Sequence, residues 1–278
     1  MMNECLPPQN HTANLTAKNH TATPPPTTTT DAWYDGSLHL TQPARQHGFR
    51  ATSDAVLLAA SIPATARHIW EFGIGTGAAA LIVLKRLPAS HITGVDCDAS
   101  LLALAKHNGE VNGFGGRLSL MHADLTTARF APPKQYQSHR PPPDHVMMNP
   151  PYNDPASTPP RQHKTQTAKT ADFCPTWIEA AASCLTTKGG VSVICRTSSL
   201  APLLSALTTN GFGESVVRPI HATLARPANR VLVRARKGIQ GGVTLLPPLL
   251  CDSDEYARTS HGGYISLIPP GRKQGKIK

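Results

Sequence analysis

The chain has 278 residues, a length that allows one or two domains, and 40% of these residues are apolar, enough for a sizeable core. Lysine and arginine outnumber aspartate and glutamate by 27 to 17, and the net charge of +10 favours a polyanionic partner such as nucleic acid. The apolar run 78–84 ends at Lys85, well short of the roughly 20 residues of a membrane span, so a membrane-spanning protein is excluded.

The N-terminal residues and the cysteines bear on the cellular compartment. Residues 1–10 contain no basic stretch followed by an apolar run, so we expect no secretory signal and a cytoplasmic protein. No CxxC pair and no dense framework is formed by the six cysteines, which stand at positions 5, 97, 174, 184, 195 and 251. We therefore expect reduced thiols and no structural metal.

Composition divides the chain into three parts. Residues 1–30 are rich in threonine and proline and carry only two charged side chains, Glu4 and Lys18, so they offer too little apolar surface to offset their ordering entropy. We expect 1–30 to be a disordered tail, 31–240 to form the folded domain, and 241–278 to be an extension with a basic end.

The apolar pattern predicts helices and strands that alternate along the chain, which is typical of a mainly parallel α/β sheet. Ser100 is the expected N-cap of one helix, and five prolines within 131–143 indicate a surface excursion between two strands. The expected elements are, in chain order, a helix at 54–60, a strand at 69–72, a helix at 76–87, a strand at 92–95, a helix at 101–111, strands at 118–122 and 145–148, a helix at 177–185, and strands at 191–196, 215–220 and 230–236.

A glycine loop follows the first of these strands and opens the next helix. Gly73, Gly75 and Gly77 let a ligand approach the backbone, and the amides of the helix start face that ligand. Asp96 ends the next strand, where a carboxylate can accept both hydroxyls of a ribose. The pattern predicts an adenosine-type cofactor at the carboxyl edge of the sheet, and at this point a nicotinamide cofactor also fits.

The tetrad Asn149-Pro150-Pro151-Tyr152 follows the strand at 145–148. The lone pair of an exocyclic aryl amine is delocalised into the ring, and two acceptors aimed at its hydrogens return electron density to the nitrogen. The Asn149 side-chain oxygen and the Pro150 carbonyl are candidates for these acceptors. Tyr152 offers a flat face on which an unpaired or flipped-out base can stack.

This tetrad resembles the NPPY motif of class I S-adenosylmethionine-dependent amino methyltransferases. The segments 48–59 and 226–238 are similar to segments of bacterial tRNA adenine-N6 methyltransferases of the tRNA1(Val) type, and the matches together span roughly residues 35 to 240. The resemblance implies an α/β, Rossmann-like class I methyltransferase fold, a doubly wound seven-stranded sheet with the last strand antiparallel. It also implies S-adenosyl-L-methionine as cofactor.

Family roles transfer to the positions that match the motifs. Glu71 and the three glycines match the motif that binds the methionine part of the cofactor, Asp96 matches the ribose acid, and Asp124 matches the acid that holds the adenine amino group. Asp54 is expected either to position the methionine end or to cap a helix. The implied reaction is an in-line methyl transfer with no metal and no covalent catalysis.

The resemblance implies tRNA as substrate, with the target at the exocyclic N6 amine of the adenine immediately 3′ of a valine anticodon. Phosphates near the target are expected to meet two basic clusters, Arg161, His163, Lys164 and Lys169, and Arg272, Lys273, Lys276 and Lys278.

Other substrates and a silent module remain alternatives. The same tetrad serves glutamine-N5 methyltransferases of peptide release factors, which usually carry a helical domain before the glycine loop. Guanine-N2 methyltransferases of ribosomal RNA commonly have phenylalanine where this chain has Tyr152, and DNA adenine methylation is also compatible with the motif. A catalytically silent RNA-binding or chaperone-like module is the alternative from another class.

Overall fold

The computed structural model describes residues 28–45, 47–48, 50–126, 130, 141–150 and 173–268. The predicted tail up to residue 27, both predicted basic clusters and most of the proline-rich segment lie outside the described residues. Pro151 and Tyr152 lie outside them as well, whereas Asn149 and Pro150 lie within.

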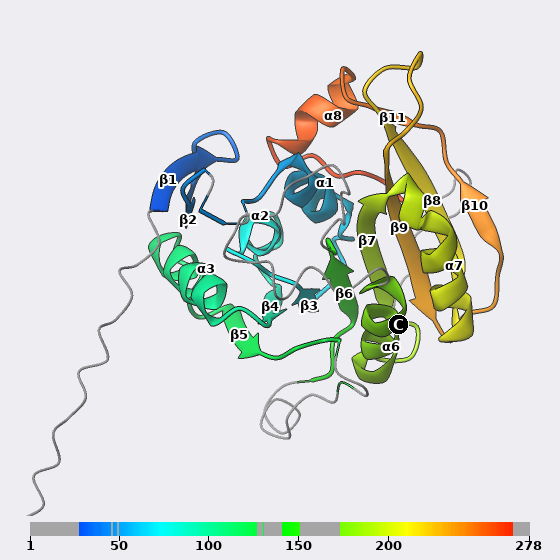
Figure 1. Ribbon diagram of the computed structural model, residues 1–278, viewed down its shortest axis with the longest axis horizontal. Helices are drawn as coiled ribbons and strands as arrows, with labels where there is room; N and C mark the ends of the chain where they lie inside the picture. The colour runs from blue at the N-terminus through cyan, green and yellow to red at the C-terminus, as the bar shows by residue number, and fades with distance from the viewer. Residues whose placement is uncertain are drawn as a thin grey trace, which may run out of the picture.

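The centre of the structure is a nine-stranded sheet (Figure 1). Its strands run in the order β10-β8-β9-β7-β6-β3-β4-β5, and β11 also pairs with β8. In chain order they are β3 (His68–Phe72), β4 (His91–Asp96), β5 (Leu118–His122), β6 (His145–Met148), β7 (Gly190–Arg196), β8 (Phe212–His221), β9 (Arg230–Lys237), β10 (Val243–Leu245) and β11 (Leu249–Leu250).

The predicted seven-stranded arrangement is confirmed for β3 to β9. Of these seven, β9 is antiparallel and lies between β7 and β8, and the others are parallel. The short strands β10 and β11 follow β9 in the chain and pair parallel with β8, so they extend the sheet beyond the seven. The strand order reverses between β3 and β6, the place where sheets of this kind bind ligands.

Helices cover both faces of this sheet (Figure 1). One face carries α1, α2 and α3, and the opposite face carries α6 and α7. The helices of the described residues are α1 (Ser53–Ser61), α2 (Ala78–Arg86), α3 (Ala99–Val111), α6 (Phe173–Cys184), α7 (Leu200–Thr209) and α8 (Asp254–Thr259), and the 3-10 turn η1 (Thr197–Ser199) precedes α7.

Alternate side chains of the central strands enter two cores. Ile69 of β3 and Met147 of β6 belong to the core under α1 and α2, whereas Phe72 and Met148 belong to the core under α6. Strands that are buried on both faces are apolar at nearly every position, as in β6, where every residue is buried. The strands that carry the candidate site are therefore held between the two cores.

The expected N-cap of α3 is wrong. The side chain of Asp98, and not that of Ser100, accepts hydrogen bonds from the helix start, at 2.8 Å from Ser100 N and 3.3 Å from Leu101 N. The Ser100 hydroxyl itself donates to Asp98. The Asp98 carboxylate carries charge, so its hydrogen bonds to the helix-start amides are charge-assisted. The expected end of the helix at residue 111 is confirmed, and Asn112 is its C-cap.

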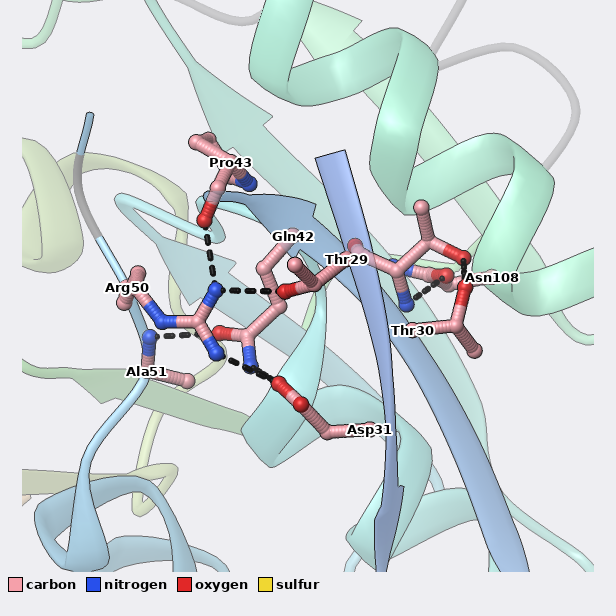
Figure 2. Close-up of polar contacts among 9 residues, drawn as sticks. Thr29, Thr30, Asp31, Gln42, Pro43, Arg50, Ala51 and Asn108 are labelled. Carbon is pink, nitrogen blue, oxygen red and sulfur yellow. Dashed lines mark hydrogen bonds and ion pairs between the residues drawn. The ribbon is translucent and has the colours of Figure 1, made fainter. Parts of the chain in front are cut away.

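A β-hairpin precedes the sheet and was not predicted. Strands β1 (Thr28–Trp33) and β2 (Leu38–Pro43) pair antiparallel, so residues 28–30, which the sequence assigns to the tail, belong to a strand. The β-branched threonines favour strand geometry. The hairpin is held by a residue outside it: Arg50 forms an ion pair with Asp31 at 2.5 Å. Figure 2 shows these two side chains facing each other.

The described part of the extension after residue 240 packs against the domain. Ile265 and Leu267 are buried, and Ile265 N donates to Ala60 O of α1 at 2.9 Å. Glu255 of α8 accepts two hydrogen bonds from Arg218 of β8, at 2.6 and 2.7 Å. Residues 241–268 are therefore built into the fold. No helix among the described residues is long and apolar enough to cross a membrane.

A buried histidine predicts how stability depends on pH. His145 is fully enclosed, its Nε2 lies 2.9 Å from Ser192 Oγ, and burial together with the charge of Arg234 lowers its pKa to about 3. Below pH 6.5 the unfolded chain takes up a proton that the folded chain does not, so stability falls as the pH falls. Urea unfolding should show that His145→Gln removes about 2 kcal/mol of the stability difference between pH 7 and pH 5. An unchanged difference would show that His145 titrates normally.

Candidate active site

The ends of β3 and β6 bring the glycine loop next to the tetrad. Phe72 is paired with Met148, and each is the last residue of its strand. Gly73 and Asn149 follow this pair directly, on neighbouring strands that lie about 4.8 Å apart. A ligand above the glycine loop and an amine held by Asn149 would therefore meet at one point.

Three left-handed residues shape the loop between β3 and α2. Gly73, Gly75 and Gly77 have φ values of 69°, 56° and 87°, a region that residues with a side chain rarely adopt. The amides of Gly73 and Ile74 both donate to Val95 O of β4, at 2.8 and 3.1 Å. The loop is thus folded back over β4, and its glycines are required by backbone conformation.

Gly73 is also required by close packing. A Cβ at this position would lie 2.7 Å from Cη2 of Trp177, a ring of α6 that packs edge-on against Phe72. The glycine loop therefore packs on an aromatic side chain from the core under α6. Trp177 was not predicted to take part in the site, since its contact joins segments about a hundred residues apart.

Glu71 is a buried carboxylate below the loop. It is 4% exposed, and its Oε2 has no hydrogen-bond partner among the described residues. Burial raises its pKa well above the ordinary value, while the backbone N–H of Ala80 in the first turn of α2 lowers it and Asp96 adds to the increase. A buried acid without a cation fits a positively charged ligand.

Asp96 lies at the end of β4, where the sequence predicts the ribose acid. Its carboxylate accepts from Gly75 N at 2.8 Å and from Asp98 N at 3.0 Å, so it is joined directly to the glycine loop. Burial raises its pKa, and these backbone amides oppose the increase. The structure places Asp96 beside the loop, and its contact with a ribose stays a prediction.

Asp124 follows β5 and lies on the exposed surface of the same edge. It accepts from the amide and the hydroxyl of Thr126, at 2.8 and 2.7 Å. Nearby, burial and the charges of Asp96, Asp124 and Asp98 raise the pKa of the Cys97 thiol. The three carboxylates thus surround one short segment, and the predicted role of Asp124 toward an adenine stays a prediction.

Asp54 is held by an arginine from β9. It is 4% exposed and forms an ion pair with Arg230. The helix cap of α1 is Thr52, whose hydroxyl accepts from Asp54 N at 3.3 Å, so the capping role expected for Asp54 is wrong. Its role toward the methionine end of a cofactor stays a prediction. Arg230 was not predicted as a partner.

The described half of the tetrad lies at the switch point of the sheet. Asn149 is partly buried and Pro150 is buried, directly after the fully buried strand β6. They lie on the same edge as Glu71 and the glycine loop, and Asp96 completes this edge from β4. No group of three or more potential metal ligands was found among the residues that the structure describes.

A family comparison agrees with this arrangement. The model of the methyltransferase small domain matches residues 51–210, more than half of the chain, from the start of α1 to the end of α7. The chain belongs to the methyltransferase small domain family. The matched range contains the glycine loop, Asp96 and Asn149, so the family assignment rests on the segment that builds the candidate site.

Three curated relatives of this methyltransferase carry the printed name tRNA1(Val) (adenine(37)-N6)-methyltransferase. The protein from Vibrio parahaemolyticus is 24% identical over 80% of this chain and 91% of its own length. The one from Shewanella sp. strain MR-4 is 29% identical over 68% of this chain and 79% of its own length. A Flavobacteriaceae protein is 33% identical over 52% of this chain and 59% of its own length.

A solved structure has a similar fold. The crystal structure of a predicted O-methyltransferase, protein Atu636 from Agrobacterium tumefaciens, matches with a TM-score of 0.62 and 25% identity, over 76% of this chain and 97% of that one. Together with the family match, this makes the protein a class I S-adenosylmethionine-dependent methyltransferase with a Rossmann-like fold.

The site fits this cofactor. S-adenosylmethionine supplies a methyl group on a positively charged sulfur, and the edge offers the buried carboxylate of Glu71 and glycines that leave the backbone open. Asp96 would hold the ribose, and Asp124 the adenine. This arrangement orients two reactants and supplies charge, which is what a direct methyl transfer requires.

Gly94 supports the loop and was not predicted. A Cβ at this position of β4 would collide with the side chain of Ile74, which reaches down from the glycine loop. A glycine inside a buried strand is a signal of such a close approach, and the sequence contains it at the centre of the segment 92–95. The loop therefore packs on two sides, with the Ile74 side chain against Gly94 and Gly73 against Trp177.

Substitution of Gly73 tests this packing. Gly73→Ala and its control Gly113→Ala both place a side chain at positive φ, 69° and 76°, but only the Gly73 Cβ meets a neighbour within 4 Å. We expect the control to cost about 1 kcal/mol of stability. Gly73→Ala should cost about 1–3 kcal/mol more because of overpacking, and it should weaken cofactor binding. Urea unfolding and calorimetry measure both effects. Equal losses in the two variants would contradict the packing role of Gly73.

Proposed function

We propose that this methyltransferase transfers a methyl group to the exocyclic N6 amine of an adenine in tRNA, the anticodon-loop adenine of a valine tRNA. The observation that carries this proposal is the position of Asn149 and Pro150 beside the glycine loop, at the end of β6. The printed name of relatives matched over as much as 91% of their length supports the tRNA substrate. A tRNA substrate also places the activity in the cytoplasm.

The chemistry depends on the two oxygens of Asn149 and Pro150. Each accepts one hydrogen of the amine, so electron density moves from the ring back onto the nitrogen. S-adenosylmethionine bound at the glycine loop would supply the methyl carbon to this nitrogen, and the electron pair of the broken carbon–sulfur bond would stay on sulfur. The amine then releases one proton to solvent. Pro151 and Tyr152 are proposed to hold the turn and to stack on the base, which must leave its helix or loop stack to enter.

Positive side chains on the same edge support RNA as the substrate. Arg196 ends β7, the neighbour of β6, and the β8–β9 loop at 222–229 carries the exposed Arg226. The loop has a fixed shape because Thr197 N donates to Asn229 O at 3.1 Å and the His221 ring bonds Arg226 O at 2.9 Å. Phosphates flanking the target base would lie within reach of these arginines.

A methyl-transfer assay tests the proposal. Labelled S-adenosylmethionine is offered in parallel to unmodified tRNA, a release factor, ribosomal RNA and DNA, and the labelled nucleoside or residue is then identified. We expect N6-methyladenosine in tRNA. Label on the release factor, on guanine or on DNA would support methyl transfer to nitrogen but contradict the proposed tRNA adenine substrate. Binding of cofactor without any transfer would favour a silent module.

Removal of the acceptor side chain tests the role of Asn149. Asn149→Ala should lower kcat by at least about 100-fold, because the transition state loses a preorganised acceptor, while calorimetry shows cofactor affinity within about 2-fold of the parent. A variant that methylates tRNA as fast as the parent would contradict the role of this residue.

Charge reversal tests the RNA-facing edge. Arg226→Glu should raise KM for tRNA about 5- to 10-fold at low salt, and the effect should shrink as salt increases. Lys188→Glu is the matched control, because Lys188 is exposed at the opposite end of β7, in the turn before Gly190. If both variants change KM equally, net charge alone explains the effect and this edge does not contact RNA.

A further inference from the structure

The free edge of β2 is paired by asparagine side chains of α3. Asn112 accepts from His39 N at 2.9 Å and donates to His39 O at 2.7 Å. One helical turn earlier, Asn108 accepts from Thr41 N at 2.8 Å and donates to Thr41 O at 2.8 Å. The two amides thus replace a neighbouring strand, and they fasten the hairpin to α3.

Asn108 makes one further contact that Asn112 does not make. Its side-chain nitrogen also donates to Thr76 O in the glycine loop, at 2.9 Å, and the residue is 0% exposed. Both amide hydrogens and the amide oxygen are therefore used. Thr76 precedes Gly77, the N-cap of α2, so its carbonyl lies outside the ladder of that helix. Asn108 supplies the donor that this carbonyl needs.

The hairpin is itself fixed on its other side, as Figure 2 shows. Arg50 donates to Asp31 and to Pro43 O, each at 2.5 Å. Gln42, which is 1% exposed, donates to Asp31 at 2.9 Å and accepts from Ala51 N at 2.9 Å. A continuous set of hydrogen bonds therefore runs from residue 50, through the hairpin and Asn108, to the glycine loop.

We propose that Asn108 is a positioning residue for the cofactor, which holds the glycine loop in its binding shape, with the β1–β2 hairpin as outer support. The loop contains Gly75 and Gly77 on either side of Thr76, and glycines leave the backbone free to adopt many conformations. A fixed Thr76 carbonyl removes much of this freedom before the cofactor arrives. The free-energy cost of ordering the loop on cofactor binding is then smaller.

This inference does not depend on the proposed tRNA substrate, because it concerns the cofactor alone. Asn108→Ala removes the bonds to β2 and to Thr76 O, whereas the matched control, Asn112→Ala, removes only bonds to the hairpin and the Asn112 bond to Asn108 O within α3. The full chain is titrated with S-adenosylhomocysteine by calorimetry. We expect Kd to rise about 5- to 20-fold for Asn108→Ala and less than about 2-fold for the control.

Hydrogen exchange of the cofactor-free protein gives an independent readout. Amides at 73–77 should exchange faster in Asn108→Ala and unchanged in Asn112→Ala, although both variants melt at a lower temperature than the parent. If Asn108→Ala does not fold, Asn108→Asp is used, since it keeps the acceptor for Thr41 N and loses the donor to Thr76 O. Equal Kd values and equal exchange at 73–77 in the Asn108 and Asn112 variants would overturn the proposal.

Discussion

The reversal of strand order between β3 and β6 is the constraint on which the site depends. Because the two strands are parallel neighbours, the residues that follow Phe72 and Met148 must emerge side by side at the carboxyl edge. The glycine loop and Asn149 are therefore brought together by the topology, although 75 residues of chain lie between the paired residues Phe72 and Met148. Both strands are almost fully buried, so the two cores hold the ends that carry these residues in place.

Elements with a strong local signal could be predicted from the sequence. The strands 69–72 and 92–95 and the helix 76–87 agree with β3, β4 and α2 to within two residues at either end, because apolar runs bounded by glycine or proline are local features. The hairpin could not be predicted, since β1 is a polar segment held by Arg50 and, through β2, by Asn108. The same holds for α8, whose Glu255 is fixed by Arg218 of a distant strand.

The candidate site shows the same division. Spacing predicts the three glycines and Asp96, and the structure gives the physical reason, positive φ at each glycine and a hydrogen bond from Gly75 to Asp96. The residues that support the glycine loop could not be predicted from motif spacing. Trp177 and Asn108 act through tertiary contacts, and no feature of their own segments marks them. Of the three supports, only Gly94 could have been found from the sequence, because a glycine inside a buried strand indicates a close approach of another segment.

A crystal structure with bound S-adenosylhomocysteine would show whether one edge of the sheet presents the cofactor to an amine held by Asn149. We expect the ribose hydroxyls to contact Asp96 and the sulfur to lie above Gly73, facing the Asn149 side chain. A ligand bound away from the glycine loop, or a sulfur that points away from Asn149, would contradict this arrangement of cofactor and amine.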